Sequence, residues 1–375
     1  MVYILIGIAF LIAACMSAFV IPQVAFIAYD KKLFDEPGGR KIHTKATPRL
    51  GGIVFFPVVS FTLFLVIGVD VLLTGVPSGT NRLPGGDLFF LFCGLLLLNL
   101  VGIKDDLYEV KYRAKFIIQL IVAVLISVSG FWIDNLHGFL GVHALPPYMG
   151  VPLTILVFVS VINSINLIDG IDGLASGLCM ICLATLGVAF LIGGAWLYAL
   201  LAFVTIGVLI PFFIYNVFGK PGEQKIFMGD TGSLTLGCVI AFLAIGLMTM
   251  TPDTLPYSDE VIVIAFGSLV VPIFDVCRVI LVRARRKKHL FTADKNHIHH
   301  KFLMMGFTSR RTMVAILFMA AFFNLLNIIL CQFVNCTFVL LIDVVLWVGL
   351  HLWLNRLISK KERREMAVEV LKGVA

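Results

Sequence analysis

The chain has 375 residues, of which 60% are hydrophobic and 14% charged, and its mean hydropathy is +1.02. A soluble domain averages about 45–50% apolar and about 25% charged residues, so this excess excludes a cytosolic globular enzyme, a disordered protein and a secreted disulfide scaffold. The formal net charge of +7 is less informative than the distribution of the basic residues. We therefore expect an all-α integral membrane protein.

The apolar sequence divides into long runs separated by charged or turn residues. A spanning helix needs about 20 apolar residues. The first run has neither a basic leading region nor a small-residue cleavage site, so we expect it to be retained as a helix. The whole chain, residues 1–375, is expected to form one polytopic domain. The runs predict eleven spanning helices, near residues 3–28, 51–73, 87–103, 114–133, 151–167, 174–193, 195–217, 233–250, 260–282, 312–331 and 336–355.

Basic residues are concentrated in alternate connections between these helices. The segments 30–50, 104–115, 216–232, 283–311 and 356–375 carry six, four, two, nine and six of the 29 Lys and Arg residues. The positive-inside rule places such segments in the cytoplasm, so the N-terminus is predicted outside and the C-terminus inside. We interpret the basic tail 356–375 as a solvated helical end in preference to a segment on the anionic inner leaflet. Residue types suited to catalysis are concentrated in the same cytoplasmic connections.

The first basic connection contains a strip suited to anions. His43, Lys45 and Arg49 precede Gly51 and Gly52 at the predicted cytoplasmic face. This strip is expected to lie beside any phosphate site on that face.

The third helix is predicted to end just before two adjacent acids, Asp105 and Asp106. Two carboxylates in a poorly hydrated site repel each other, so at least one needs a cation or a proton. The pair could handle Mg²⁺ or phosphate, with Lys111, Arg113 and Lys115 as nearby anion contacts. A solvated helix cap with ordinary cytoplasmic lysines is the alternative, and this motif alone favours it.

Polar residues recur at every third position where the fifth helix ends. They are Asn163, Asn166, Asp169 and Asp172, of which the first two share a helical face. Amides and carboxylates at a membrane helix end are costly unless they bind something. A polar turn that caps two helices explains one or two of these residues but not four, so we favour a functional site.

The segment before the eighth helix combines an acid and an aromatic ring. Asp230 is expected on the loop, where Thr231 or Ser233 would cap a helix whose free N–H groups favour an anion. Phe227 offers a surface on which a base could stack, and Asn216 could reach the same pocket or cap the seventh helix. Mg²⁺ prefers one or two protein oxygens with water and phosphate as its other ligands. An ordinary capped helix start is the alternative.

The largest basic connection contains His297, His299 and His300. Mg²⁺ prefers oxygen to imidazole, so these side chains are better suited to binding phosphate or moving a proton. A basic loop on anionic lipid is the alternative. Asp275, in the ninth helix, is expected to orient this loop or to pair with Arg278 one turn away.

Acids, amides, an aromatic ring and several cations therefore map to one membrane face. This set suits a nucleotide diphosphate with Mg²⁺ that meets a second substrate from the lipid. Four ordered motifs, DDLYEV, NSINLIDGIDGLASG, FMGDTGSLTLG and HIHH, resemble the polyprenyl-phosphate N-acetylhexosamine-1-phosphate transferase family. The resemblance covers about residues 30–310.

The resemblance implies a reaction and a set of site residues. A UDP-sugar and a polyprenyl phosphate would give a polyprenyl-diphosphate sugar and UMP, with Mg²⁺ as cofactor and Mn²⁺ as its substitute. The motif positions imply Asp105 and Asp106 as catalytic acids, Asn166 and Asp230 as metal ligands, Phe227, Asp172, Asn163, Asp169 and Asn216 around the nucleotide, and Lys45, Lys115, His297, His299 and His300 as anion contacts.

The branch of the family is indicated by the histidine motif, which Ile298 interrupts. Peptidoglycan translocases usually have three consecutive histidines, so the resemblance favours transfer of GlcNAc-1-phosphate to undecaprenyl phosphate. Such a reaction starts a lipid-linked glycan such as O-antigen or a teichoic-acid linkage unit. Transfer of phospho-MurNAc-pentapeptide or of another UDP-N-acetylated sugar stays open.

A secondary transporter is the alternative from another class. Acids gathered on one face and the absence of an evident internal repeat disfavour it. The expected protein is a multi-pass enzyme of the bacterial inner membrane with a cytoplasmic active-site cleft. Its partners would be the two substrates and membrane lipid, without nucleic acid, and a homodimer is left open.

Overall fold

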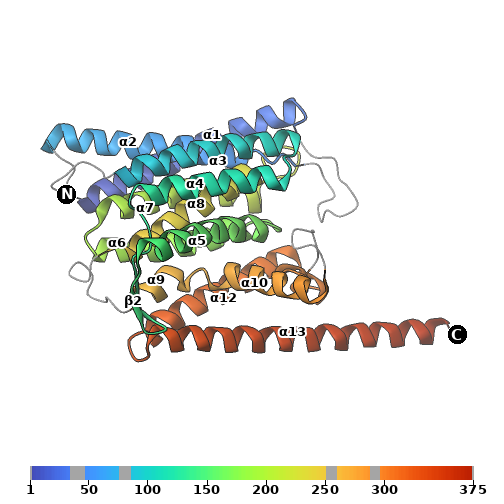
Figure 1. Ribbon diagram of the computed structural model, residues 1–375. Helices are drawn as coiled ribbons and strands as arrows, with labels where there is room; N and C mark the ends of the chain where they lie inside the picture. The colour runs from blue at the N-terminus through green and yellow to red at the C-terminus, as the bar shows by residue number, and fades with distance from the viewer. Residues whose placement is uncertain (1, 34–46, 76–85, 251–259, 288–295, 374–375) are drawn as a thin grey trace.

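The computed structural model of the chain describes residues 2–33, 47–75, 86–250, 260–287 and 296–373. It is a bundle of helices that run in roughly one direction, and the C-terminal helix projects beyond the rest (Figure 1). The elements are α1 (Val2–Asp30), a 3-10 turn η1 (Gly51–Val54), α2 (Phe55–Thr74), α3 (Gly86–Tyr108), α4 (Tyr112–Val128), β1 (Asn135–Phe139), β2 (Val142–Ala144), α5 (Pro147–Ile168), α6 (Leu174–Ile192), α7 (Trp196–Phe218), α8 (Gly229–Met248), α9 (Val261–Gly267), α10 (Val270–Arg285), α11 (Ile298–Met304), α12 (Ser309–Leu330) and α13 (Cys336–Gly373).

The helices correspond closely to the predicted spans. Within the described residues, nine helices are long and apolar enough to cross a membrane, and there are ten if the bent pair α9–α10 is one span. The remaining predicted segment is α4, whose 17 residues fall short of the about 20 that a perpendicular span needs. The chain is therefore a multi-pass helical membrane protein, while the count of eleven and the orientation stay predictions.

Helix α8 occupies the centre of the bundle, between α3 and α5. Every residue in its apolar stretch is buried within the protein. Glycines allow the neighbours to approach it closely: a Cβ added at Gly102 of α3 would collide with the backbone of Thr231, and one at Gly237 of α8 would lie 2.7 Å from the Cα of Ile162 in α5. The start of α8 is thus fixed against the ends of α3 and α5.

The outer helices present apolar side chains away from this core. Phe19 of α1, Leu72 of α2, Phe318 of α12 and Phe338 of α13 are all exposed. Exposed apolar surface of this kind is unfavourable in contact with water and suits contact with lipid. The distribution supports the membrane assignment made from composition.

The predicted ninth span is not one straight helix. It is divided into α9 and α10, whose axes differ in direction by 73°. Pro272 lies in the first turn of α10, where its missing N–H is tolerated, but it cannot donate to the carbonyl of Ser268 and continue α9. The expectation of a single helix over 260–282 is therefore wrong, because the proline starts a second helix.

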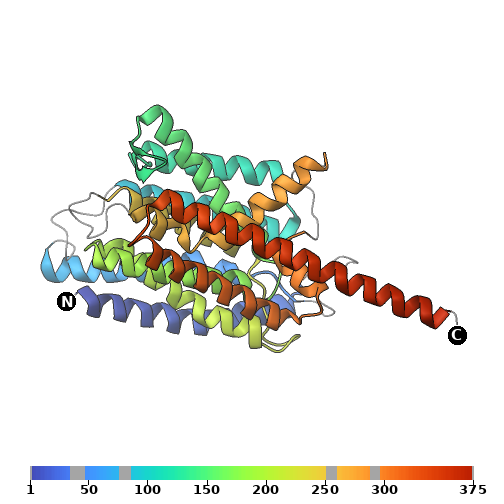
Figure 2. The ribbon, with the colours of Figure 1, turned by 90° about the horizontal axis from the view of Figure 1, so that it is seen from below.

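Helix α13 continues to Gly373, so the apolar span that was predicted to end near residue 355 and the basic tail, predicted as a solvated helical end, form one helix whose basic part projects beyond the bundle (Figure 2). One further element differs from expectation. The connection between α4 and α5 forms an antiparallel hairpin of β1 and β2, so the described chain is not entirely helical. Gly138 and Gly141 adopt positive φ in this hairpin, and such turn positions are not visible in a search for apolar runs.

Candidate active site

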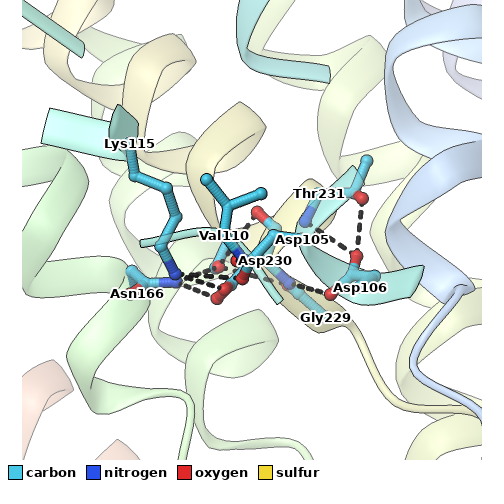
Figure 3. A network of polar contacts seen from close by, with 9 residues as sticks. Asp105, Asp106, Val110, Lys115, Asn166, Gly229, Asp230 and Thr231 are labelled. Carbon is cyan, nitrogen blue, oxygen red and sulfur yellow. Dashed lines mark hydrogen bonds and ion pairs between the residues drawn. The ribbon is translucent and has the colours of Figure 1, made fainter. Parts of the chain in front are cut away.

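A lysine bridges two carboxylates where three helices meet. Lys115 Nζ of α4 lies 2.9 Å from Asp105 Oδ2 of α3 and 2.8 Å from Asp230 Oδ2 of α8 (Figure 3). All three side chains are largely shielded from water. An ion pair in such surroundings is stronger than one on an open surface, so Lys115 holds together two acids that would otherwise repel each other.

The end of α5 joins this centre through Asn166. Its Nδ2 donates to Asp230 Oδ1 at 2.5 Å and to Ser233 Oγ at 2.8 Å. Asp230 therefore contacts Asn166 with one oxygen and Lys115 with the other. The two predicted metal-binding residues are adjacent, although they lie 64 residues apart in the sequence.

Asp106 has a different set of partners from Asp105. Its carboxylate accepts hydrogen bonds from the backbone N–H of Asp230 at 2.7 Å, the backbone N–H of Thr231 at 3.0 Å and the Thr231 hydroxyl at 2.6 Å. Asp106 thus caps the N-terminus of α8 from the neighbouring helix. The expectation that Asp230 lies on a loop is wrong, because the helix begins at Gly229.

A second group of contacts joins the turn after α5 to the segment before α8. Asp172 Oδ2 lies 2.5 Å from Lys225 Nζ, which is 5.9 Å from the ring centroid of Phe227. Sequence reasoning missed Lys225, although its position two residues before Phe227 was a usable signal. The carboxylate, ammonium and ring together form a polar and aromatic surface suited to a base or sugar.

Asn216 and Asn163 bind within the protein. The Asn216 Oδ1 accepts from the Gly173 N–H at 2.6 Å, and its Nδ2 donates to the Ile226 carbonyl at 2.8 Å. Asn163 Nδ2 donates to Gln119 Oε1 at 2.6 Å and so connects α5 to α4. Both amides hold the walls of the site in position.

Asp169 lies between the two groups, at the C-terminal end of α5. The surrounding protein and the nearby carboxylates of Asp230, Asp106 and Asp172 raise the pKa of Asp169. The site therefore concentrates negative charge, which favours binding of a cation or of a substrate with several hydrogen-bond donors.

The histidine motif lies against the turn after α5. A Cβ added at Gly170 would be 2.5 Å from His299 Nε2, and the rings of His299 and His300 have centroids 4.2 Å apart. Burial, with repulsion by His300 and His297, lowers the pKa of His299 to about 3. At neutral pH His299 is therefore uncharged, and it can contact an anion only as a hydrogen-bond donor.

Asp275 orients this motif as predicted. It accepts hydrogen bonds from the His297 ring at 2.8 Å and from the Ile298 N–H at 3.0 Å, and it pairs with Arg278 at 3.1 Å. Both roles expected for Asp275 are confirmed.

The strip after the first helix is described only in part. Lys45 and His43 lie outside the described residues. The following backbone adjoins the site, since Phe227 N–H donates to the Pro48 carbonyl at 2.8 Å and Gly52 N–H donates to the Met228 carbonyl at 2.9 Å.

The side chains of the site can be compared with the ligands that a metal ion requires. Over the described ranges, no three His, Cys, Asp or Glu side chains converge on one point. Asp105 and Asp230 nevertheless share a cation, the ammonium group of Lys115. Mg²⁺ prefers hard oxygen ligands and needs only one or two of them from the protein, so these carboxylates suit it. Their chemistry fits a magnesium ion completed by water and substrate phosphate.

Comparison with known proteins gives a consistent result. The sequence model of "Glycosyl transferase family 4" matches residues 88–248. A Bacillus subtilis (strain 168) protein named "Probable undecaprenyl-phosphate N-acetylglucosaminyl 1-phosphate transferase" is 34% identical over 326 residues, which cover 87% of this chain and 85% of that protein. Proteins named "Undecaprenyl-phosphate alpha-N-acetylglucosaminyl 1-phosphate transferase" from Yersinia pestis and Escherichia coli (strain K12) are each 28% identical, over 79% and 77% of this chain and 76% and 74% of their own lengths.

Proposed function

The chain belongs to glycosyltransferase family 4, and on that premise we propose that it transfers GlcNAc-1-phosphate from UDP-GlcNAc to undecaprenyl phosphate. The names of its relatives describe this activity. The observation that carries the proposal is the Lys115 bridge between Asp105 and Asp230, which joins two of the family motifs at adjoining helix ends of a membrane protein. A lipid phosphate and a soluble nucleotide can meet at such a place.

The reaction exchanges one phosphorus–oxygen bond for another. An oxygen of the lipid phosphate bonds to the β-phosphorus of UDP-GlcNAc, the bond from that phosphorus to the bridging oxygen breaks, and UMP leaves with that oxygen. A phosphate monoester has a second pKa near 6, so the nucleophile is largely a dianion at neutral pH. The protein mainly positions the reactants and neutralises their charge.

The side chains divide this task among them. Asp172, Lys225 and Phe227 would hold the nucleoside, while Lys115 would donate to the phosphate oxygens. Asp105 would orient Lys115 toward the incoming lipid phosphate.

We infer that Mg²⁺, with Mn²⁺ as a substitute, would be held by Asp230 with Asn166 and with support from Asp105. When bound, the ion would neutralise diphosphate oxygens. The carboxylates keep that position anionic, and Asp106 fixes the start of α8 from which Asp230 projects.

The membrane orientation belongs to the same proposal. The site lies where α3, α5 and α7 end and where α4 and α8 begin, and the basic connections are adjacent to these ends. The positive-inside rule supports a site at the cytoplasmic face with the N-terminus outside, and we propose that the membrane is the bacterial inner membrane.

Release of UMP by the purified protein tests the proposal. Asp105→Asn and Asp230→Asn should each abolish UMP release from UDP-GlcNAc and undecaprenyl phosphate while the protein stays folded. Asp87→Asn is the matched control, because Asp87 lies at the opposite end of α3 and bonds to Tyr198. Near-normal turnover in both site variants would contradict the assignment.

A parallel reaction with UDP-MurNAc-pentapeptide tests the donor. If transfer from that donor is equal or faster, UDP-MurNAc-pentapeptide would replace UDP-GlcNAc as the proposed donor. Failure with both donors, in protein that binds undecaprenyl phosphate, would leave another UDP-N-acetylated sugar as the substrate.

A further inference from the structure

Lys301 follows the histidine motif directly, and its side chain is turned into the protein. The residue is only 8% exposed, although it belongs to a short helix, α11, in a strongly basic part of the chain. Its Nζ lies 3.0 Å from His351 Nδ1 and 2.8 Å from Asn355 Oδ1, and both partners belong to α13. A buried cation is costly unless its hydrogen bonds are made, so these contacts are specific.

The two partners are placed to receive an ammonium group. His351 and Asn355 are four residues apart and so share one face of α13. An ammonium group only donates, so His351 must present an unprotonated Nδ1 to Lys301. Burial lowers the pKa of Lys301 to about 8, with a further lowering by Arg278 and an opposing effect of Asp275.

Helix α11 is consequently anchored at its start and at its middle. At its start, Asp275 of α10 binds the His297 ring and the Ile298 N–H. One turn later, Lys301 binds α13. His299 lies between these anchors, and its ring packs so closely on Gly170 that a Cβ there would lie 2.5 Å from Nε2. A shift of α11 would therefore displace the ring from the turn after α5.

We propose that Lys301 is a positioning residue for the transfer reaction: its contacts with His351 and Asn355 on α13 hold the histidine motif against the active site. This inference rests on the proposed function for its kinetic effect. In this proposal the C-terminal helix fixes the position of α11.

Kinetics and hydrogen exchange of variants test this proposal. Lys301→Met keeps the length of the side chain and removes its charge and donors. Because misplacement of a reacting group by about 1 Å can cost up to about 100-fold in rate, we expect kcat to fall by about tenfold, with KM for UDP-GlcNAc within about twofold. His351→Leu should have a similar effect, and the double variant should be little worse than either single variant. Lys301→Arg, which keeps the charge and donors, should recover most of the loss.

Hydrogen exchange reports on position without relying on turnover. In Lys301→Met, amides of residues 297–304 should exchange at least several-fold faster, while those of α8 stay protected. Lys360→Met is the control, because it removes an exposed lysine elsewhere on α13 and should change neither measurement.

Three results would overturn the inference. They are unchanged exchange over 297–304, an equal rise in exchange across α8, or wild-type kcat in Lys301→Met. If the wild-type protein releases no UMP, the proposed function fails, but the exchange measurement still decides whether Lys301 fixes α11.

Discussion

The carboxylate of Asp106 accepts a hydrogen bond from the backbone N–H of Asp230 at 2.7 Å. The two neighbouring acids at the end of α3 therefore have separate tasks. Asp105 contacts the ammonium of Lys115, whereas Asp106 satisfies the N-terminal amides of the central helix. Their adjacency in sequence does not make them a chelating pair, because successive helical residues point in different directions.

Asp106→Ala should lower both stability and activity. Removing a capping side chain costs about 0.5–2 kcal/mol, and here the freed amides would have to find other partners in a buried site. UMP release should fall by more than tenfold, because Asp230 begins the helix that loses its cap. Thermal unfolding and UMP release measure the two effects. A variant with unchanged melting temperature and rate would show that Asp106 does not fix the start of α8.

Lys225→Met should weaken nucleotide binding more than chemistry. The ammonium contacts Asp172 and lies near the Phe227 ring, away from the bridge formed by Lys115. We expect KM for UDP-GlcNAc to rise by about tenfold, with kcat within about threefold. Initial rates over a range of UDP-GlcNAc concentrations provide both constants. Lys220→Met, at an exposed lysine in the same connection, is the control, and equal KM values in the two variants would refute the assignment.

Gly102→Ala should destabilise the bundle, and Gly68→Ala should not. A Cβ at Gly102 collides with the backbone of Thr231, whereas one at Gly68 of α2 meets no atom within 4 Å. Overpacking typically costs about 1–3 kcal/mol, and the strain would fall beside Asp230. Melting temperatures and UMP release of the two variants provide the comparison. Similar melting temperatures would mean that α3 and α8 can separate without cost.

His299 should make the protein sensitive to acid. Its pKa is about 3 in the folded protein and near 6.5 in an unfolded chain, so between these values only the unfolded chain takes up the proton. Stability is therefore lost as pH falls from 6.5 toward 3, by up to about 1.4 kcal/mol per pH unit. Melting temperatures from pH 7 to pH 4 should fall less steeply in His299→Asn than in wild type.

An exposed histidine provides the control for this effect. His143→Asn, in β2, should retain the wild-type slope. Equal slopes for His299→Asn and wild type would mean that His299 titrates alike in the folded and unfolded states.

Spans could be predicted because each must present a continuous apolar length to lipid. Helix ends were harder to predict, and α3 and α8 show why. Asp105 and Asp106 look like the solvated end of α3, yet their partners are Lys115 and the backbone of α8. A sequence shows the polarity of an end but not the partner that satisfies it. The predicted end at residue 103 is therefore five residues short of Tyr108.

Individual functional lysines were also difficult to predict from the sequence. Lys225 and Lys301 lie in connections that are predicted to be cytoplasmic, where basic residues are expected for orientation alone. Only their contacts with Asp172 and with α13 distinguish them from the exposed lysines beside them. By contrast, the motif acids and amides were found because such groups at membrane helix ends are costly without a partner.

The enclosure of α8 has a consequence for the bilayer around the protein. A helix with neighbours on every side has no boundary lipid of its own. Acyl chains that are too short or too long would tilt or compress the peripheral helices first, and Asp230 would move only if those helices transmitted the strain inward. Close contacts at Gly102 and Gly237 pack α8 tightly against α3 and α5. We therefore expect the catalytic geometry to respond weakly to changes in membrane thickness.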